Sequence, residues 1–182
     1  ANSSNSIELA STIIYSIGVC MMFGFSALYH RVDWRSRVLI IMRRLDHSAI
    51  FVMIAGSFTP ICLLVLPGNT GIQLLFIIWI IAGIGILQTV LFTETPRLIR
   101  AGIYLVAGYM AIPYLSVMFS VMSMTNFILT AASGTIYTVG AIGYGFQFPD
   151  ISPKYFGYHE FFHILVSIAA VLHFIVIYSI VG

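Results

Sequence analysis

Apolar residues fill six long runs of this chain, and short polar segments separate the runs. A helix needs about 20 apolar residues to cross the hydrocarbon core of a bilayer. Each run reaches that length, so the pattern predicts an all-α, polytopic membrane helix bundle that forms a single transmembrane domain over residues 1–182. The expected spans are residues 7–30, 46–66, 71–92, 101–120, 124–146 and 158–181.

The composition indicates a membrane protein and limits the classes of partner that it can bind. Hydrophobic residues make up 60% of the chain and charged residues 8%, whereas soluble domains carry about 25% charged residues. The net charge of +2 is too small to indicate a nucleic-acid partner. Cys20 and Cys62 lie inside apolar runs and do not suggest a disulfide framework. We therefore expect an integral membrane protein whose partners are membrane lipids.

The basic residues predict which ends of the spans face the cytoplasm. Cytoplasmic loops of membrane proteins carry an excess of Lys and Arg. If the spans alternate in direction, all eight basic residues fall on one side. They are Arg31, Arg35, Arg37, Arg43, Arg44, Arg97, Arg100 and Lys154. We expect this side to be cytoplasmic, with both ends of the given chain, including the C-terminus, outside.

Residues 31–45 carry five of these charges between the first two spans. We expect this segment to be a basic cytoplasmic loop or a short amphipathic helix at the membrane interface. Such a segment can bind anionic lipids or simply determine topology, and we favour the second reading.

The same topology brings polar side chains of three spans to one depth. Ser26 and His30 end the first span, and Asp46 begins the second. His159 and His163 begin the last span, and their spacing of four residues places both imidazoles on one helix face. Ionisable side chains at membrane depth are costly, so a group of them predicts a functional site.

The chemistry of this group suits zinc, which in catalytic sites commonly has three protein ligands and one water. We assign His30, His159 and His163 as the metal ligands. Asp46 is either a fourth ligand or the carboxylate that orients the bound water and takes its proton, and we favour the second role. Ser26 is placed to donate a hydrogen bond to a developing oxyanion or to a substrate carbonyl.

Other polar residues are weaker candidates. His173 lies ten residues beyond His163 and is expected to be a buried packing histidine. His47 should point about 100° away from Asp46, toward a neighbouring helix. Glu160 is either a partner of an imidazole or a contact with solvent.

Three motifs taken together resemble the hemolysin III family, the bacterial branch of the group that includes the adiponectin receptors. They are Ser26-x-x-x-His30, the stretch Arg43–Phe51 with Ala55–Pro60, and His159-x-x-x-His163. The resemblance covers essentially the whole chain. It implies a zinc site made of Ser26, His30, Asp46, His159 and His163, with the three histidines as ligands and Asp46 on the bound water. The wider superfamily contains alkaline ceramidases, which are intramembrane zinc amidases.

The chain departs from the family pattern in its number of spans. The family has seven spans with the N-terminus inside, whereas this chain has six predicted spans. The first of these carries the Ser-x-x-x-His motif of the family's second helix. We therefore expect the given chain to lack the family's first helix.

Three functions follow from these expectations. The first is a zinc-dependent hydrolase of lipid amides or esters, resembling a ceramidase and placed in a bacterial plasma (inner) membrane with its site toward the cytoplasm. The second is a receptor or sensor whose zinc is structural. The third is a cytolytic protein, as the family name suggests.

Overall fold

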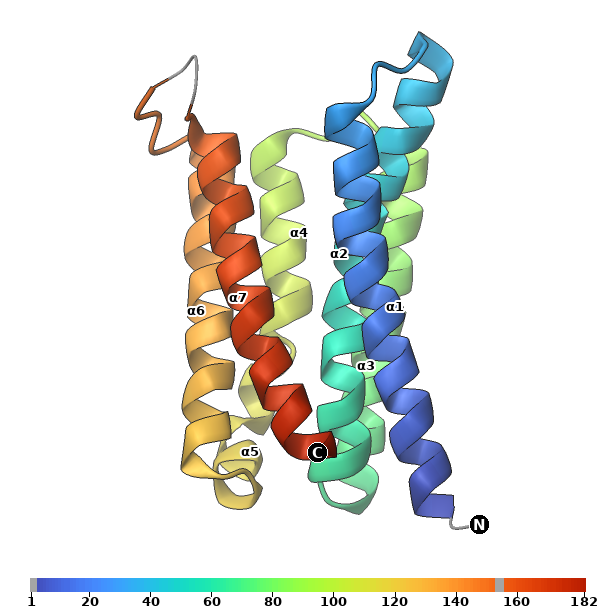
Figure 1. Ribbon diagram of the computed structural model, residues 1–182, viewed down its shortest axis with the longest axis vertical. Coiled ribbons are helices and arrows are strands. Elements are labelled where there is room, and N and C mark those ends of the chain that lie inside the picture. The colour runs from blue at the N-terminus through green and yellow to red at the C-terminus, as the bar shows by residue number, and fades with distance from the viewer. Residues whose placement is uncertain (1–2, 153–155) are drawn as a thin grey trace. The chain divides into compact units, whose positions relative to one another are not determined.

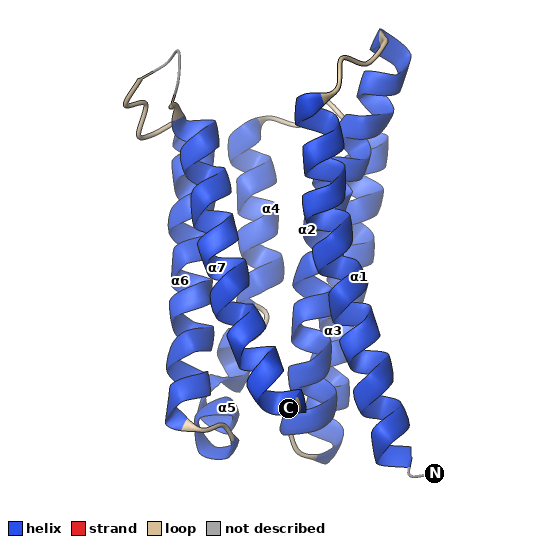
Figure 2. Ribbon diagram, in the orientation of Figure 1, coloured by secondary structure: helices blue, strands red, loops and turns tan. Residues whose placement is uncertain are grey.

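The computed structural model describes residues 3–152 and 156–182, and this part of the chain contains helices and no strand (Figure 2). Six helices within it are long and apolar enough to cross a membrane, which confirms the predicted all-α membrane fold. The helices form two compact units, one up to Glu94 and the other from Thr95 to Ile180. Lys154, which the charge argument counted, lies outside the described residues.

The first unit contains three spans. They are α1 (Ser3–Arg31), α2 (Ser36–Pro60) with the π-helical turn η1 (Ile61–Val65) that extends it, and α3 (Gly68–Leu91). The helix α2 packs against both α1 and α3 (Figure 1). Glycine permits the close contact between α1 and α2, because a Cβ on Gly18 would lie 3.1 Å from the carbonyl oxygen of Val52.

The helix α2 begins earlier than the apolar pattern indicated, at Ser36 instead of residue 46. Residues 36–45 are therefore the first turns of a membrane helix, and not a loop or a separate interfacial helix. Together α2 and η1 have 30 residues, a length of about 45 Å, which exceeds the roughly 30 Å hydrocarbon core. Polar contacts hold these extra turns against the end of α3. Arg44 Nε donates to Thr93 Oγ1 at 2.8 Å, and Arg43 pairs with Glu94 at 3.7 Å.

The second unit contains the remaining spans. They are α4 (Arg97–Tyr109), which continues through the 3-10 turn η2 (Ile112–Tyr114) and α5 (Leu115–Val121), then α6 (Met124–Phe146) and α7 (Tyr158–Val181). The expected span 101–120 is thus an interrupted helix. Pro113 lies in the interruption and has no N–H to continue the hydrogen-bond ladder of α4.

Close packing places the beginning of α7 beside α6 and α4. A Cβ on Gly145 of α6 would lie 3.2 Å from the side chain of Leu98 in α4. Farther along α6, the buried Ser133 Oγ donates to the carbonyl oxygen of Ala169 in α7 at 3.0 Å. These contacts join α6 to α4 and to α7, the helix that carries His159 and His163.

Candidate metal centre

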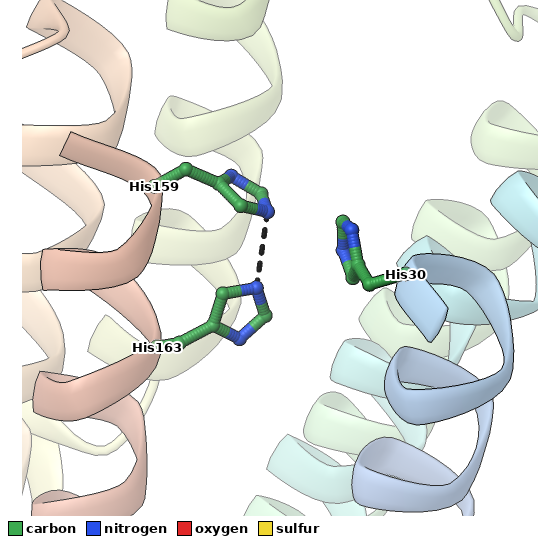
Figure 3. Close-up of side chains that lie close together, drawn as sticks. All are labelled: His30, His159 and His163. Carbon is green, nitrogen blue, oxygen red and sulfur yellow. Dashed lines mark hydrogen bonds between the residues drawn. The ribbon is translucent and has the colours of Figure 1, made fainter. Parts of the chain in front are cut away.

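The first two turns of α7 hold a pair of converging imidazoles. The Nε2 atoms of His159 and His163 lie 3.0 Å apart, as the dashed line in Figure 3 marks. The two rings meet edge to face, with centroids 4.6 Å apart. Two nitrogens bound to one tetrahedral zinc at 2.0–2.1 Å lie about 3.3 Å from each other. The pair therefore has nearly the separation that two ligands of one metal ion require, and the prediction that both face the same way is confirmed.

Glu160 stabilises the helix end that carries this pair. Its Oε2 accepts a hydrogen bond from the backbone N–H of Gly157 at 3.0 Å, the residue before the first turn of α7. A carboxylate at a helix N-terminus satisfies a free N–H and interacts favourably with the helix dipole. Glu160 is exposed and acts as a capping residue, a third role beside the two considered from the sequence.

Aromatic rings surround the imidazoles within the second unit. The Tyr144 ring on α6 lies 5.9 Å from that of His159 and 5.1 Å from that of Phe162. The ring centroids of Phe162 and His163 lie 5.7 Å apart, and those of Tyr158 and His159 lie 6.4 Å apart. Sequence reasoning did not identify Tyr144, because it lies on another helix and in a run rich in small and apolar residues.

The C-terminal turns of α1 carry the candidates of the first unit. Ser26 and His30 are one turn apart on the same face of this helix, and His30, labelled in Figure 3, is exposed. The Tyr29 ring packs edge-on against His30 at 4.6 Å and against His47 of α2 at 6.4 Å. Tyr29 therefore connects the end of α1 to the beginning of α2, a role that the sequence did not suggest.

Asp46 and His47 form a largely buried pair at this end of α2, with side chains 12% exposed. His47 Nδ1 lies 3.2 Å from Asp46 Oδ2 and 2.8 Å from the carbonyl oxygen of Arg43. Because a carbonyl oxygen only accepts, Nδ1 carries the proton and donates to Arg43, and the Asp46 carboxylate lies beside this nitrogen. The expectation that His47 turns away from Asp46 is wrong, since side-chain torsions bring together two groups that start about 100° apart on the helix.

The candidates are thus arranged in two groups. Within the first unit, the structure joins Asp46 to His47 and places Ser26 one turn from His30. Within the second unit, it joins His159 to His163. His173 is buried at 4% exposure, as expected. The candidate ligands in these groups are imidazole nitrogens and one carboxylate, which are ligand types that zinc accepts.

Comparison with known proteins identifies the family. A family model described as "Haemolysin-III related" matches residues 1–174. The chain belongs to the hemolysin III family. Together with the six apolar helices, this makes it an integral membrane protein.

Curated relatives of this hemolysin III chain extend from bacteria to animals. It is 32% identical to the "Hemolysin-3 homolog" of Bacillus subtilis (strain 168), over 79% of this chain and 67% of that protein. It is 34% identical to "Hemolysin-3" of Bacillus cereus, over 71% of this chain and 58% of that protein. An "Adiponectin receptor protein" of Drosophila melanogaster is 28% identical, over 88% of this chain and 40% of that protein. The chain thus spans between about two fifths and two thirds of the length of these relatives.

Proposed function

We propose that this hemolysin III protein is an intramembrane zinc hydrolase that cleaves an amide or ester bond of a membrane lipid. The observation that carries the proposal is the convergence of His159 and His163, whose Nε2 atoms lie 3.0 Å apart in the first turns of a membrane helix. Ionisable groups are costly at such a depth and mark functional sites by default.

In this proposal His30, His159 and His163 hold the zinc ion, as the motif resemblance implies. Three nitrogen ligands leave a fourth position open, as in catalytic zinc sites. Bound zinc would supply Lewis-acid chemistry and lower the pKa of a water in that position to about 7.

In the proposed reaction Asp46 would accept a proton from the water, and Ser26 would stabilise the negative charge that develops on the substrate oxygen. The Asp46 carboxylate lies 3.2 Å from His47 Nδ1 through Oδ2, and we propose that it takes a proton from the attacking water. Ser26, one turn before His30, would donate its hydroxyl proton to the oxygen that becomes negative when the carbonyl is attacked.

We place the protein in a bacterial plasma membrane with this site toward the cytoplasm and the C-terminus outside. The support is the distribution of basic residues, all of which lie in the connections between alternate pairs of spans or in the helix turns next to these connections.

Metal analysis followed by a lipid hydrolysis screen tests the proposal. Purified wild-type protein should carry about one zinc per chain, and His163→Ala should lose it. Asp46→Asn should keep the metal and lose turnover of ceramides or ester lipids. His173→Gln, on the same helix but not a proposed ligand, is the matched control and should keep the metal. Zinc-loaded protein that hydrolyses no lipid in the panel would overturn the hydrolase.

Two alternative functions remain beside the hydrolase. A receptor with structural zinc is favoured by the similarity to a protein named as an adiponectin receptor. In that case chelation should lower thermal stability, and no lipid turnover should exist to be lost. A cytolytic activity is favoured by the name of the Bacillus relatives, and leakage of dye from vesicles would detect it.

A further inference from the structure

We propose that Arg97 and Tyr158 form a binding subsite for the phosphate of an anionic phospholipid beside His159. The guanidinium carbon of Arg97 lies 5.6 Å from the centroid of the Tyr158 ring, in a cation–π arrangement. The subsite would bind the headgroup of the lipid substrate, and in this respect it rests on the proposed function.

The ends of two neighbouring helices in the second unit, α6 and α4, contact the Tyr158 ring. Gln147, which caps the end of α6, donates through Nε2 to the Tyr158 hydroxyl at 3.3 Å. The Tyr144 ring, also on α6, packs against Tyr158 with centroids 6.3 Å apart. Arg97, the first residue of α4, contributes the cation. The aromatic platform under the guanidinium therefore has contacts on both its ring and its hydroxyl.

The backbone that carries Arg97 is also anchored. Arg100 is 5% exposed, and its Nη2 donates to the carbonyl oxygen of Thr95 at 3.0 Å. This bond ties the first turn of α4 to the residues just before it. The backbone at Arg97 is thus held by a buried neighbour, and its exposed side chain is accessible to a ligand.

The guanidinium can still receive an anion while it lies on the ring. Stacking occupies one flat face, whereas the five N–H donors point outward from the edges and can bind a phosphate with two parallel hydrogen bonds. Among the described residues the guanidinium lies on Tyr158 and forms no ion pair with a carboxylate. The carboxylates of Asp150 and Glu160 lie beside Gly157, and neither forms an ion pair with Arg97.

The depth of the subsite matches a lipid headgroup. Arg97 and Tyr158 each begin a helix that can cross the membrane, and Arg and Tyr at such ends lie at the interface where lipid phosphates are found. Tyr158 directly precedes His159, and the two rings lie 6.4 Å apart. A phosphate on Arg97 would thus be separated from the histidine pair by a single aromatic ring, which suits a phospholipid whose scissile bond is close to its phosphate.

Native mass spectrometry of the full chain tests the subsite by counting lipid adducts. The probes are phosphatidylglycerol and a diacylglycerol with the same acyl chains, which lacks the phosphate. Arg97→Gln should bind phosphatidylglycerol about tenfold more weakly, the effect of losing charged hydrogen bonds, and should bind diacylglycerol as the wild type does. Tyr158→Leu should weaken phosphatidylglycerol binding as well, and Tyr158→Phe, which keeps the ring, should not.

Arg35→Gln is the matched control, because Arg35 is also exposed next to a helix start but lies in the first unit. Equal losses in Arg35→Gln and Arg97→Gln would indicate diffuse surface charge and overturn the subsite. Displacement of the lipid by millimolar inorganic phosphate would assign the site to free phosphate instead.

Turnover measured on the same samples separates this subsite from the hydrolase. If no lipid is hydrolysed but Arg97→Gln still loses phosphatidylglycerol binding, the hydrolase fails and the subsite stands. If lipid is hydrolysed but phosphatidylglycerol and diacylglycerol bind equally well, the subsite fails and the hydrolase stands.

Discussion

At the scale of single residues, the histidine pair of α7 is arranged for one of two states. The 3.0 Å contact between His159 and His163 requires one Nε2–H donor and one bare Nε2 acceptor. A metal ion requires a bare lone pair on both Nε2 atoms. The hydrogen bond must therefore be lost when the pair binds metal.

Tyr144 is expected to maintain the orientation of His159, because its ring packs on both His159 and Phe162. Loss of groups that orient a ligand typically costs 10–100-fold in metal affinity. We expect Tyr144→Ala to weaken zinc binding by about tenfold, as measured by competition with a coloured chelator. Tyr144→Phe keeps the ring and should bind zinc like the wild type. Equal affinity in Tyr144→Ala and wild type would show that the ring does not orient the ligand.

His47 is expected to position the carboxylate of Asp46 through its Nδ1–H. His47→Phe removes the donor and leaves a ring of similar size. It should reduce lipid hydrolysis by up to about 100-fold, the lower end of a general-base contribution, while zinc content stays unchanged. His47→Asn, which retains an N–H donor, should recover part of the rate. A normal rate in His47→Phe would exclude this role for the histidine.

These residues also show which parts of the site are predictable from sequence. The His159–His163 contact follows from helix periodicity alone, since four residues advance an α-helix by one turn and about 40°. The Asp46–His47 contact depends on side-chain torsions, which periodicity does not determine. Tyr144 approaches His159 from another helix, so its position depends on tertiary packing.

At the scale of helices, hydropathy located the spans but not all of their ends. The basic residues of the first turns of α2 are outside the apolar run, yet helix formation continues through them to Ser36. Arg and Leu are good helix formers, and contacts with the end of α3 compensate for the lower hydropathy. The expected spans 124–146 and 158–181 agree with α6 and α7. The Ser123 cap and the left-handed Gln147 bound α6, and Gly157 and Gly182 bound α7.

Gly71 is expected to be essential to the junction between α3 and η1. A Cβ at this position would collide with the backbone carbonyl oxygen of Cys62, which cannot move without disturbing the π-helical turn. Gly71→Ala should destabilise the protein by about 1–3 kcal/mol, the usual cost of overpacking, and lower Tm in detergent by several degrees.

Gly83→Ala is the matched control for this substitution. Gly83 lies on the same helix, and a Cβ there would have no neighbour within 4 Å. Alanine favours a helix over glycine by about 1 kcal/mol, so Tm should stay constant or rise slightly. A Tm for Gly71→Ala as high as that of Gly83→Ala would mean that the junction relaxes without cost.

At the scale of the whole molecule, the proposed zinc ligands come from both compact units. His30 belongs to the first unit, and His159 and His163 belong to the second. A metal ion that needs all three would make the stability of each unit depend on the other. A metal ion bound only by the histidine pair of α7 would stabilise the second unit without affecting the first.

Removal of zinc distinguishes these two cases. A ligand present at 100 times its Kd stabilises the folded state by about 2.7 kcal/mol, so chelation should lower the Tm of the wild-type protein. If the site needs all three histidines, His30→Ala and His163→Ala should each have the Tm of the chelated wild type and show no further change with chelator. A full chelator response in His30→Ala would mean that His30 is not a ligand and that the α7 pair binds zinc with other donors. His173→Gln should respond as the wild type does, because this buried histidine is not a proposed ligand.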